Sequence, residues 1–207
     1  MLKSENKPHL FSPNPEIQKV LDFWFGGEAD AQIQRWFSSN PEFDQVIRSE
    51  LGSLHAQACQ GNLGDWERTP EGSLALLILL DQCSRNLFRG SGQAFAWDAQ
   101  ALALAKALCT SGGDQALPAL ARLFVYLPFE HSEALEDQDL AISLLQKLQT
   151  QAPAGLEAAM ASFVDYAFQH REVIARFGRF PHRNARLNRA STPEELEFLS
   201  QPGSAFG

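Results

Sequence analysis

The chain has 207 residues, of which 44% are apolar and 20% are charged, and its 25 acidic and 17 basic residues give a formal net charge of −8. This length is enough for one well-filled hydrophobic core or two small ones. The acidic balance argues against a protein that works mainly by neutralising nucleic-acid phosphates, since such proteins usually carry the opposite charge.

The cysteines and the apolar segments indicate a reducing compartment and no membrane span. Cys59, Cys83 and Cys109 are an odd number without CxxC spacing, which argues against a disulfide framework and against a zinc ribbon. The first sixteen residues contain no apolar stretch typical of a signal peptide. The longest apolar run, Leu74–Leu80, is far shorter than the ~20 residues that a membrane span needs. We therefore expect a soluble, cytoplasmic protein.

One local pattern marks four helix starts, because each copy places a capping side chain before a proline and an acid. The copies are Asn14-Pro15-Glu16, Asn40-Pro41-Glu42, Thr69-Pro70-Glu71 and Thr192-Pro193-Glu194. The capping oxygen accepts from free backbone amides, the proline needs no donor at the first helical position, and the carboxylate lies at the positive end of the helix dipole. Thr192 and Glu195 also have the spacing of a capping box.

A coarse assignment gives nine helices and no strand. They span residues 15–24, 29–37, 41–59, 70–83, 93–110, 114–127, 133–150, 154–177 and 193–199. Gly61, Gly112 and Gly178 lie where helix ends are expected, since glycine readily adopts the left-handed conformation of a helix terminus. Short connections favour antiparallel neighbours. We predict a single all-α domain over residues 1–207, built of stacked antiparallel helical hairpins, with residues 1–12 and 200–207 as loose tails.

Three of these helices place polar residues where burial is expected. Helix 70–83 is apolar on every face over Leu74–Leu80, which predicts a central helix, and Asp81 follows that run directly. In helix 154–177, His170 lies within an apolar stripe and should face the core or a cleft. Gln138 interrupts the apolar stripe of helix 133–150. Buried polar groups cost about 1–3 kcal/mol when unpaired, so these side chains need partners.

Several strings resemble the bacterial domain-of-unknown-function family 924 (DUF924). They are VLDFWFG (20–26), LDQCSRNLFRG (80–90), YLPFEHSE (126–133), FGRFPHRN (177–184) and the tail QPGS (201–204). The match runs in order over residues 15–206. The resemblance implies an all-helical fold similar to tetratricopeptide arrays and implies no particular reaction, and the chain has no strict 34-residue repeat. Where the family pattern has Phe-Pro before Arg-Asn, this chain has Cys83-Ser84, and Asn188 stands where glycine is frequent.

Residues 171–189 are strongly basic, with six arginines and one acid, Glu172. The arginines are Arg171, Arg176, Arg179, Arg183, Arg186 and Arg189, and residues 130–139 carry the acids Glu130, Glu133, Glu136, Asp137 and Asp139. In one interpretation these two segments neutralise each other as surface ion pairs, each worth ~0–1 kcal/mol. In the other, Arg179 or Arg183 clamps an anion, because the planar guanidinium binds carboxylate or phosphate through two parallel hydrogen bonds. The overall acidity disfavours a third interpretation, RNA binding.

Two Arg-Asn pairs follow predicted helix ends, at residues 85–86 and 183–184. In each pair the asparagine can bond turn backbone while the arginine reaches a buried acid. Asp81 is the obvious acid, because an ionised carboxylate at the end of an apolar helix must be paired. We expect Arg85 or Arg183 to pair with Asp81, either as a structural ion pair or as a group that orients a ligand.

The tetrapeptide Glu130-His131-Ser132-Glu133 follows the Leu127-Pro128 step, after which we expect a loop. Ser132 and Glu133 suit the start of helix 133–150, whereas Glu130 and His131 have no such structural role. Together with His170 they form a candidate acid/base group, since histidine titrates near neutrality and a carboxylate can orient its ring. A metal site with His182 is the weaker alternative, because neither HExxH nor ExxH spacing is present.

The candidate catalytic residues are therefore His131, His170 and Glu130. The ligand-binding candidates are Asp81, Arg85, Arg89, Phe129, Gln138, Tyr166, Arg179, Phe180, Arg183 and Asn184. Phe129 and Phe180 are included because we expect them on loops beside a cleft, whereas the other aromatic residues suit the core. The first hypothesis is a site for a small anionic molecule, with no cofactor or metal. The alternative is a non-catalytic module whose helical groove binds a peptide or partner helix. No oligomeric state follows from the sequence.

Overall fold

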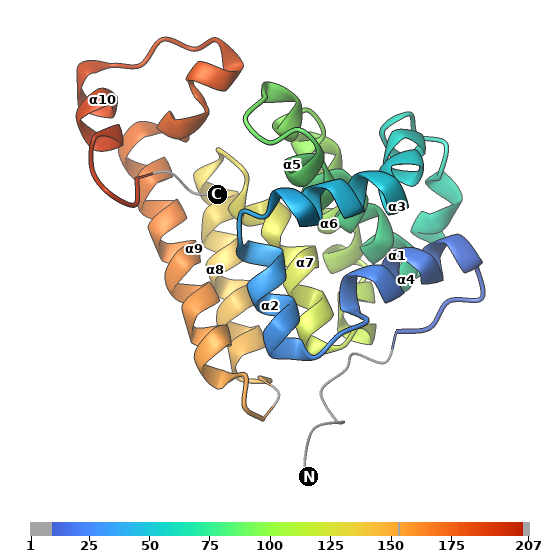
Figure 1. Ribbon diagram of the computed structural model, residues 1–207. Helices are drawn as coiled ribbons and strands as arrows, with labels where there is room; N and C mark the ends of the chain where they lie inside the picture. The colour runs from blue at the N-terminus through green and yellow to red at the C-terminus, as the bar shows by residue number, and fades with distance from the viewer. Residues whose placement is uncertain (1–9, 153, 205–207) are drawn as a thin grey trace.

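The computed structural model describes residues 10–152 and 154–204, and every regular element in them is helical (Figure 1). The α-helices are α1 (Pro15–Phe25), α2 (Ala29–Phe37), α3 (Pro41–Cys59), α4 (Pro70–Leu77), α5 (Ser84–Leu87), α6 (Asp98–Thr110), α7 (Ala119–Glu130), α8 (Leu135–Gln149), α9 (Glu157–Phe177) and α10 (Pro193–Leu199). Shorter turns are η1 (Gly64–Arg68), η3 (Gly92–Phe95), η4 (Gly113–Ala116), η5 (Pro181–Arg183) and η6 (Ala185–Leu187), and η2 (Ile78–Cys83) is a π-helix. The all-α prediction is confirmed, and each predicted helix is present.

The four capping patterns all begin helices, as predicted. Asn14 and Asn40 each accept hydrogen bonds from two backbone amides of the first turn of α1 and α3. Thr69 accepts from the amide of Gly72, and Thr192 forms the predicted capping box with Glu195. Differences occur where the pattern is absent: α6, α7 and α9 begin three to five residues later than predicted, the first two after the short turns η3 and η4.

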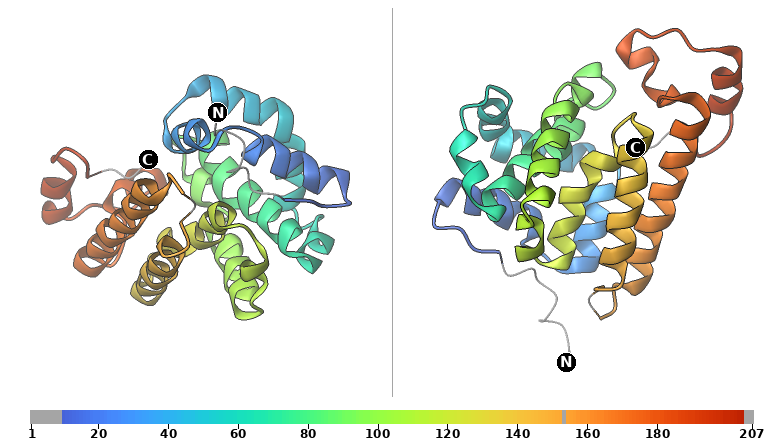
Figure 2. Two further views of the ribbon diagram at one scale, coloured as in Figure 1. Left: turned by 90° about the horizontal axis from the view of Figure 1, so that it is seen from below. Right: turned by 180° about the vertical axis from the view of Figure 1, so that it is seen from behind.

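Helix α4 is central, as its apolar run predicts, and α1, α6 and α7 pack around it. All residues of Leu74–Leu80 are buried. From α6 to α9, consecutive helices pack side by side in chain order, and Figure 2 shows α7, α8 and α9 as neighbours. The close contact between α4 and η1 depends on Gly72, because a Cβ atom there would lie 2.1 Å from the carbonyl oxygen of Trp66.

The helix that carries Asp81 does not end where the sequence predicts. Its backbone continues through the π-helix η2 into α5, so Asp81 and Arg85 lie on one continuous helix and the pair at residues 85–86 is helical rather than in a loop. A π-helix inserts extra residues per turn and is found mostly at functional sites. The proline that the family pattern places near this point is absent, which is consistent with the uninterrupted helix.

The predicted loop after Leu127 is also wrong. Helix α7 continues through Pro128 to Glu130, and His131 is its C-cap residue. Every residue from Leu120 to Glu130 is buried, so packing on all sides of α7 outweighs the local preference of proline against a helix interior. Phe129 therefore lies inside the core rather than on a loop beside a cleft.

The chain ends are more ordered than predicted, as far as the structure describes them. The Ser12 amide donates to the Gln18 side chain at 2.7 Å, and Ser204 is buried with its hydroxyl 3.2 Å from the Leu199 carbonyl oxygen. The remainder of both predicted tails, 1–9 and 205–207, lies outside the described residues. No described helix is long and apolar enough to cross a membrane. A tetratricopeptide-like superhelix stays a prediction.

Candidate functional site

A group of ionisable side chains from distant parts of the chain converges beside the C-terminus of α7. This polar cluster consists of Asp81, Arg85, Asp98, Glu130, His131, His170 and Arg183, which come from η2, α5, α6, α7 with its cap residue, α9 and η5. Six of the seven residues are among the sequence candidates. Asp98 was missed, because the sequence predicted a helix over 93–110 and gave no signal that this acid faces Arg85 and Arg183.

Asp81 and His131 form a short hydrogen-bonded pair. The Nδ1 atom of His131 lies 2.7 Å from Oδ1 of Asp81, whose side chain is only 1% exposed. Oδ2 accepts from Gln82 at 2.6 Å, and Arg85 Nη1 lies 3.4 Å from Oδ1. Burial alone would raise the pKa of Asp81, but the charge of Arg85 and the hydrogen bonds from His131 and Gln82 hold it below its usual range. Asp81 is therefore an ionised acceptor.

An ionised acceptor fixes the tautomer of His131. Its Nδ1 must carry the proton that Asp81 accepts, which leaves the lone pair of the neutral ring on Nε2. Within the described residues no side chain or backbone group bonds to that Nε2, and the His131 side chain remains 14% exposed. Burial and the charge of Arg85 lower the pKa of His131 and outweigh the opposing effect of Asp81. His131 is a neutral, oriented base.

Glu130 and His170 form a second, more deeply buried pair. His170 Nδ1 lies 3.3 Å from Oε1 of Glu130 and 2.9 Å from the carbonyl oxygen of Tyr166, and both side chains are 6% exposed. Burial, assisted by the negative charge of Asp81, raises the pKa of Glu130 to about 8. Burial also lowers the pKa of His170 to about 3. Both groups are therefore neutral at pH 7, so this contact is not an ion pair.

Gln138 supports the turn that displays these residues. Its Nε2 donates to the carbonyl oxygens of Glu130 and Ser132, each at 2.6 Å. Backbone at the end of α7 thus meets the predicted need for partners at the amide nitrogen of Gln138, whereas its Oε1 is buried without a donor in the described residues. Its role in the structure is to hold Glu130 and His131 in place, and a direct contact with a ligand is not required for that role.

Arg183 is held between two aromatic rings. Its Cζ atom lies 4.6 Å from the ring centroid of Phe95 and 4.5 Å from that of Phe180. Nη1 lies 3.2 Å from Oδ2 of Asp98, and Arg85 binds the same carboxylate with 2.9 and 3.2 Å contacts. Burial and the charge of Arg85 lower the pKa of Arg183 to about 10. Of the two arginines expected to pair with Asp81, Arg85 does so, and the partner of Arg183 is Asp98.

The Nε–H of Arg183 is left without an acceptor in the described residues. The atom is buried, and the side chain as a whole is 7% exposed. Nη1 alone bonds to Asp98, which leaves the Nε/Nη2 edge of the guanidinium without a protein partner. Most buried polar groups have a partner, so this edge calls for a functional explanation.

Other candidates have structural partners elsewhere. Arg89 pairs at 2.8 Å with Asp44, which is not part of the polar cluster. Arg179 binds Glu195 through two contacts of 2.7 and 2.8 Å, and Asn184 donates to the same carboxylate. Neither arginine meets Asp81 or Glu130.

Two aromatic candidates lie against the polar cluster. Tyr166 is 47% exposed, with its ring 5.4 Å from that of His170. Phe180 is fully buried between His170 and Arg183 rather than displayed on a loop.

The predicted neutralisation between residues 130–139 and 171–189 is confirmed for two pairs. Arg189 binds Glu133 with contacts of 2.7 and 3.0 Å, and Arg171 binds Asp139 at 2.6 Å. The metal alternative required His131, His170, His182 and Glu130 to face one ion. Among the described residues no group of three or more His, Cys, Asp or Glu could hold a metal.

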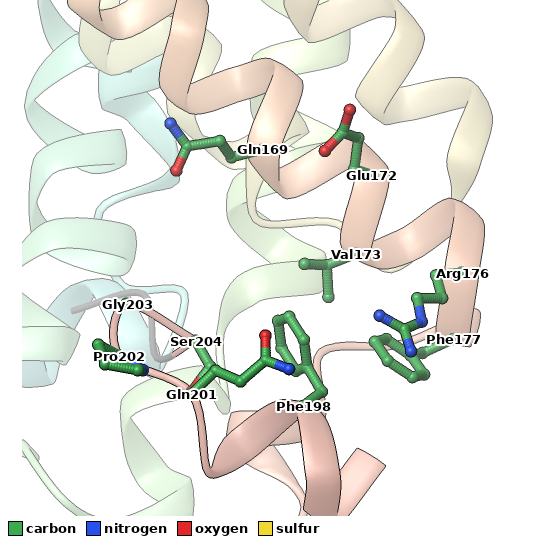
Figure 3. Close-up of a pocket in the computed structure, with 10 residues that line it drawn as sticks. All are labelled: Gln169, Glu172, Val173, Arg176, Phe177, Phe198, Gln201, Pro202, Gly203 and Ser204. Atoms are coloured by element: carbon green, nitrogen blue, oxygen red, sulfur yellow. The ribbon is translucent and has the colours of Figure 1, made fainter. Parts of the chain in front are cut away.

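A pocket of about 240 Å³ lies outside the polar cluster, between α9 and α10 (Figure 3). Its wall includes Val173, Phe177 and Phe198, and the tail string QPGS closes one side. Val173 also belongs to a small apolar core with Ile174 and Phe180 that is separate from the main core. The pocket thus adjoins the small core whose other side packs against Arg183.

Comparisons with known proteins agree with the resemblance. The model of the family described as "Bacterial protein of unknown function (DUF924)" matches residues 20–203. A solved structure of a protein of unknown function from Agrobacterium tumefaciens is 37% identical, covers 89% of this chain and 97% of its own, and superposes with a TM-score of 0.78. A search of curated proteins finds no match.

Proposed function

This chain belongs to the bacterial DUF924 family, and we propose that its polar cluster binds a small anionic molecule and moves a proton on it. The observation that carries the proposal is the Nε/Nη2 edge of Arg183, which is buried at Nε and has no protein acceptor. The rings of Phe95 and Phe180 lie 4.6 and 4.5 Å from Cζ of the guanidinium and Asp98 bonds to Nη1, so the Nε/Nη2 edge is the part offered to a ligand. A planar edge with two parallel donors suits a carboxylate or a phosphate.

Charge balance favours a ligand with a single negative charge. Arg85 and Arg183 are matched by the ionised Asp81 and Asp98, while Glu130, His131 and His170 are neutral at pH 7. An added anion therefore enters a site of zero net charge, where no excess positive charge offsets the larger cost of desolvating a second negative charge. We expect small carboxylates to bind more tightly than doubly charged phosphate.

The two buried pairs supply an acid and a base at the same pH. His131 accepts a proton at Nε2, and the imidazolium that forms is stabilised by the ionised Asp81 on Nδ1. Glu130 keeps its proton at pH 7 because burial raises its pKa to about 8. Environments that separate the pKa values of neighbouring groups are typical of acid/base sites. In this proposal His131 is the base. Glu130 is the protonated acid beside it, and His170 is the neutral partner of Glu130.

Ligand-dependent thermal unfolding tests the proposal. We expect acetate, larger monocarboxylates or phosphate to raise the melting temperature of the full chain, and Arg183→Met to abolish that increase. The control is Arg171→Met, which removes an arginine from an exposed pair with Asp139. His131→Gln should keep the fold and remove any turnover. The proposal fails if Arg183→Met and Arg171→Met respond to the same anions like the unmodified protein.

A peptide-binding module remains the second candidate. Large apolar side chains stay exposed on α8 and α9, among them Leu140 (42%), Tyr166 (47%) and Phe168 (42%). Such side chains are typical anchors for a helix or an extended peptide. This candidate would be favoured if no anion stabilises the unmodified protein or any variant, so that Arg183→Met behaves like the unmodified chain.

A further inference from the structure

The C-terminal arm, residues 178–204, is held together as one unit by Glu195. This carboxylate is 2% exposed and accepts from Arg179 at 2.7 and 2.8 Å, from the Asn184 side chain at 3.2 Å and from the Thr192 amide at 2.7 Å. These bonds connect the start, middle and last helix of the arm. Glu195 therefore ties the separate parts of the arm to one another.

The apolar attachment of the arm to the rest of the protein is small. It consists of the core formed by Val173, Ile174 and Phe180, with Phe177 and Phe198 packed against it. Figure 3 shows that this attachment is hollow on one side, where the pocket of about 240 Å³ separates α9 from α10. Segments with few buried apolar contacts open at a lower free-energy cost than the core.

Polar contacts latch the arm to the body. Glu133 accepts from Arg189 at 2.7 and 3.0 Å and from the Phe180 amide at 2.8 Å. Arg183 adds its contact with Asp98, and Arg176 of α9 pairs with Glu194 of α10 at 2.9 Å. These polar contacts can exchange protein partners for water, whereas opening also uncovers the ring of Phe180, which is fully buried when the arm is closed.

The arm also closes the proposed site. The body supplies Asp81, Glu130, His131 and His170, whereas the arm supplies Arg183 and Phe180. In the closed arrangement Glu130 and His170 are 6% exposed and the Nε atom of Arg183 is inaccessible. A ligand that bonds to the Nε–H of Arg183 therefore needs the arm to move, because that atom is buried in the closed arrangement.

We propose that residues 178–204 act as a lid that pivots at Gly178, admits the ligand and completes the site on closing. This inference rests on the proposed function of the polar cluster. Gly178 ends α9 with φ of +67°, its amide donates to the Ile174 carbonyl oxygen at 2.8 Å, and a Cβ there would meet no atom within 4 Å. Hinge positions are commonly such residues at the ends of elements. Closure brings Arg183 between Phe95 and the neutral acid/base pairs.

Hydrogen exchange of the full chain, followed by mass spectrometry, tests the lid. We expect amides of the arm to exchange through local opening, with much lower protection than amides of α7. Glu133→Gln should raise the exchange rate of the arm about five- to tenfold, because it weakens the latch, and leave α7 unchanged. The matched control is Asp139→Asn, which weakens the pair with Arg171 without touching the arm.

The outcomes separate the lid from the site. Arm amides protected as strongly as α7, or a Glu133→Gln variant that exchanges like Asp139→Asn, would overturn the lid. If acetate or phosphate raises the melting temperature but does not slow exchange of the arm, the lid is wrong and the anion site stands. If neither anion stabilises the protein, the proposed site is wrong, and the exchange of the two variants still decides whether the arm opens.

Discussion

Replacing Glu130 by glutamine should make the protein more stable at alkaline pH and leave it nearly unchanged in acid. The Glu130 carboxyl is 4% exposed and lies near the ionised Asp81, and its pKa rises from 4.5 to about 8 on folding. Between these values the folded state holds a proton that the unfolded state has lost. The stabilisation is therefore complete below pH 4.5 and decreases as the pH rises through about 8.

The magnitude follows from the width of that interval. Each pH unit changes the free energy of unfolding by about 1.4 kcal/mol when the two states differ by one proton. The interval from 4.5 to about 8 thus corresponds to on the order of 4–5 kcal/mol. Glutamine has nearly the same shape and no charge, so the variant should avoid this loss and exceed the unmodified protein by up to that amount above about pH 8.

Histidine titration opposes this effect only at lower pH. The pKa of His170 falls from 6.5 to about 3 on folding, so its contribution to stability increases as the pH rises from about 3 to 6.5. His182 behaves in the same way. From about pH 6.5 to 8 the change in unfolding free energy therefore reports Glu130 and not these two histidines.

Urea unfolding at several pH values measures the effect, with Glu133→Gln as the control. Glu133 lies three residues away, but its pKa is lowered because hydrogen bonds and charge from Arg189 outweigh burial. That variant should lose stability near neutrality and gain none at alkaline pH. Unfolding free energies of the unmodified protein that stay level from about pH 6.5 to 8.5, or an equal response of the two variants, would refute the reasoning.

Two further predictions concern stability. Asp98→Asn should lower the free energy of unfolding by ~3–5 kcal/mol, because it leaves Arg183 buried without a carboxylate. Arg183→Met should lower it by ~1 kcal/mol or less, because Asp98 keeps its pairing with Arg85. Equal losses of the two variants in urea unfolding would contradict this asymmetry. Gly72→Ala should lower the free energy of unfolding by at least ~2 kcal/mol, because its Cβ would clash with backbone. Gly52→Ala, in open space on α3, should raise it by up to ~1 kcal/mol. Thermal unfolding of both variants checks the contrast.

The sequence by itself determined the helices and part of the site. Capping is a local event, so Asn40 before Pro41 marks the start of α3 without knowledge of any other helix. The apolar period of α9 likewise placed His170 on a buried face, where the structure has it. Glu130 and His131 were identified as candidate acid/base residues from the sequence, and both lie with Asp81 in the polar cluster.

Only the tertiary structure decided which charges meet. Arg183 and Asp98 are 85 residues apart, and nothing local distinguishes Arg183 from Arg179, which binds Glu195 instead. Pro128 shows the same limit, because its local preference predicted a loop and burial of the whole of α7 outweighed it. Pairing of buried charges and tolerance of a helix proline both depend on desolvation, and desolvation is set by the surrounding helices rather than by neighbours in the chain.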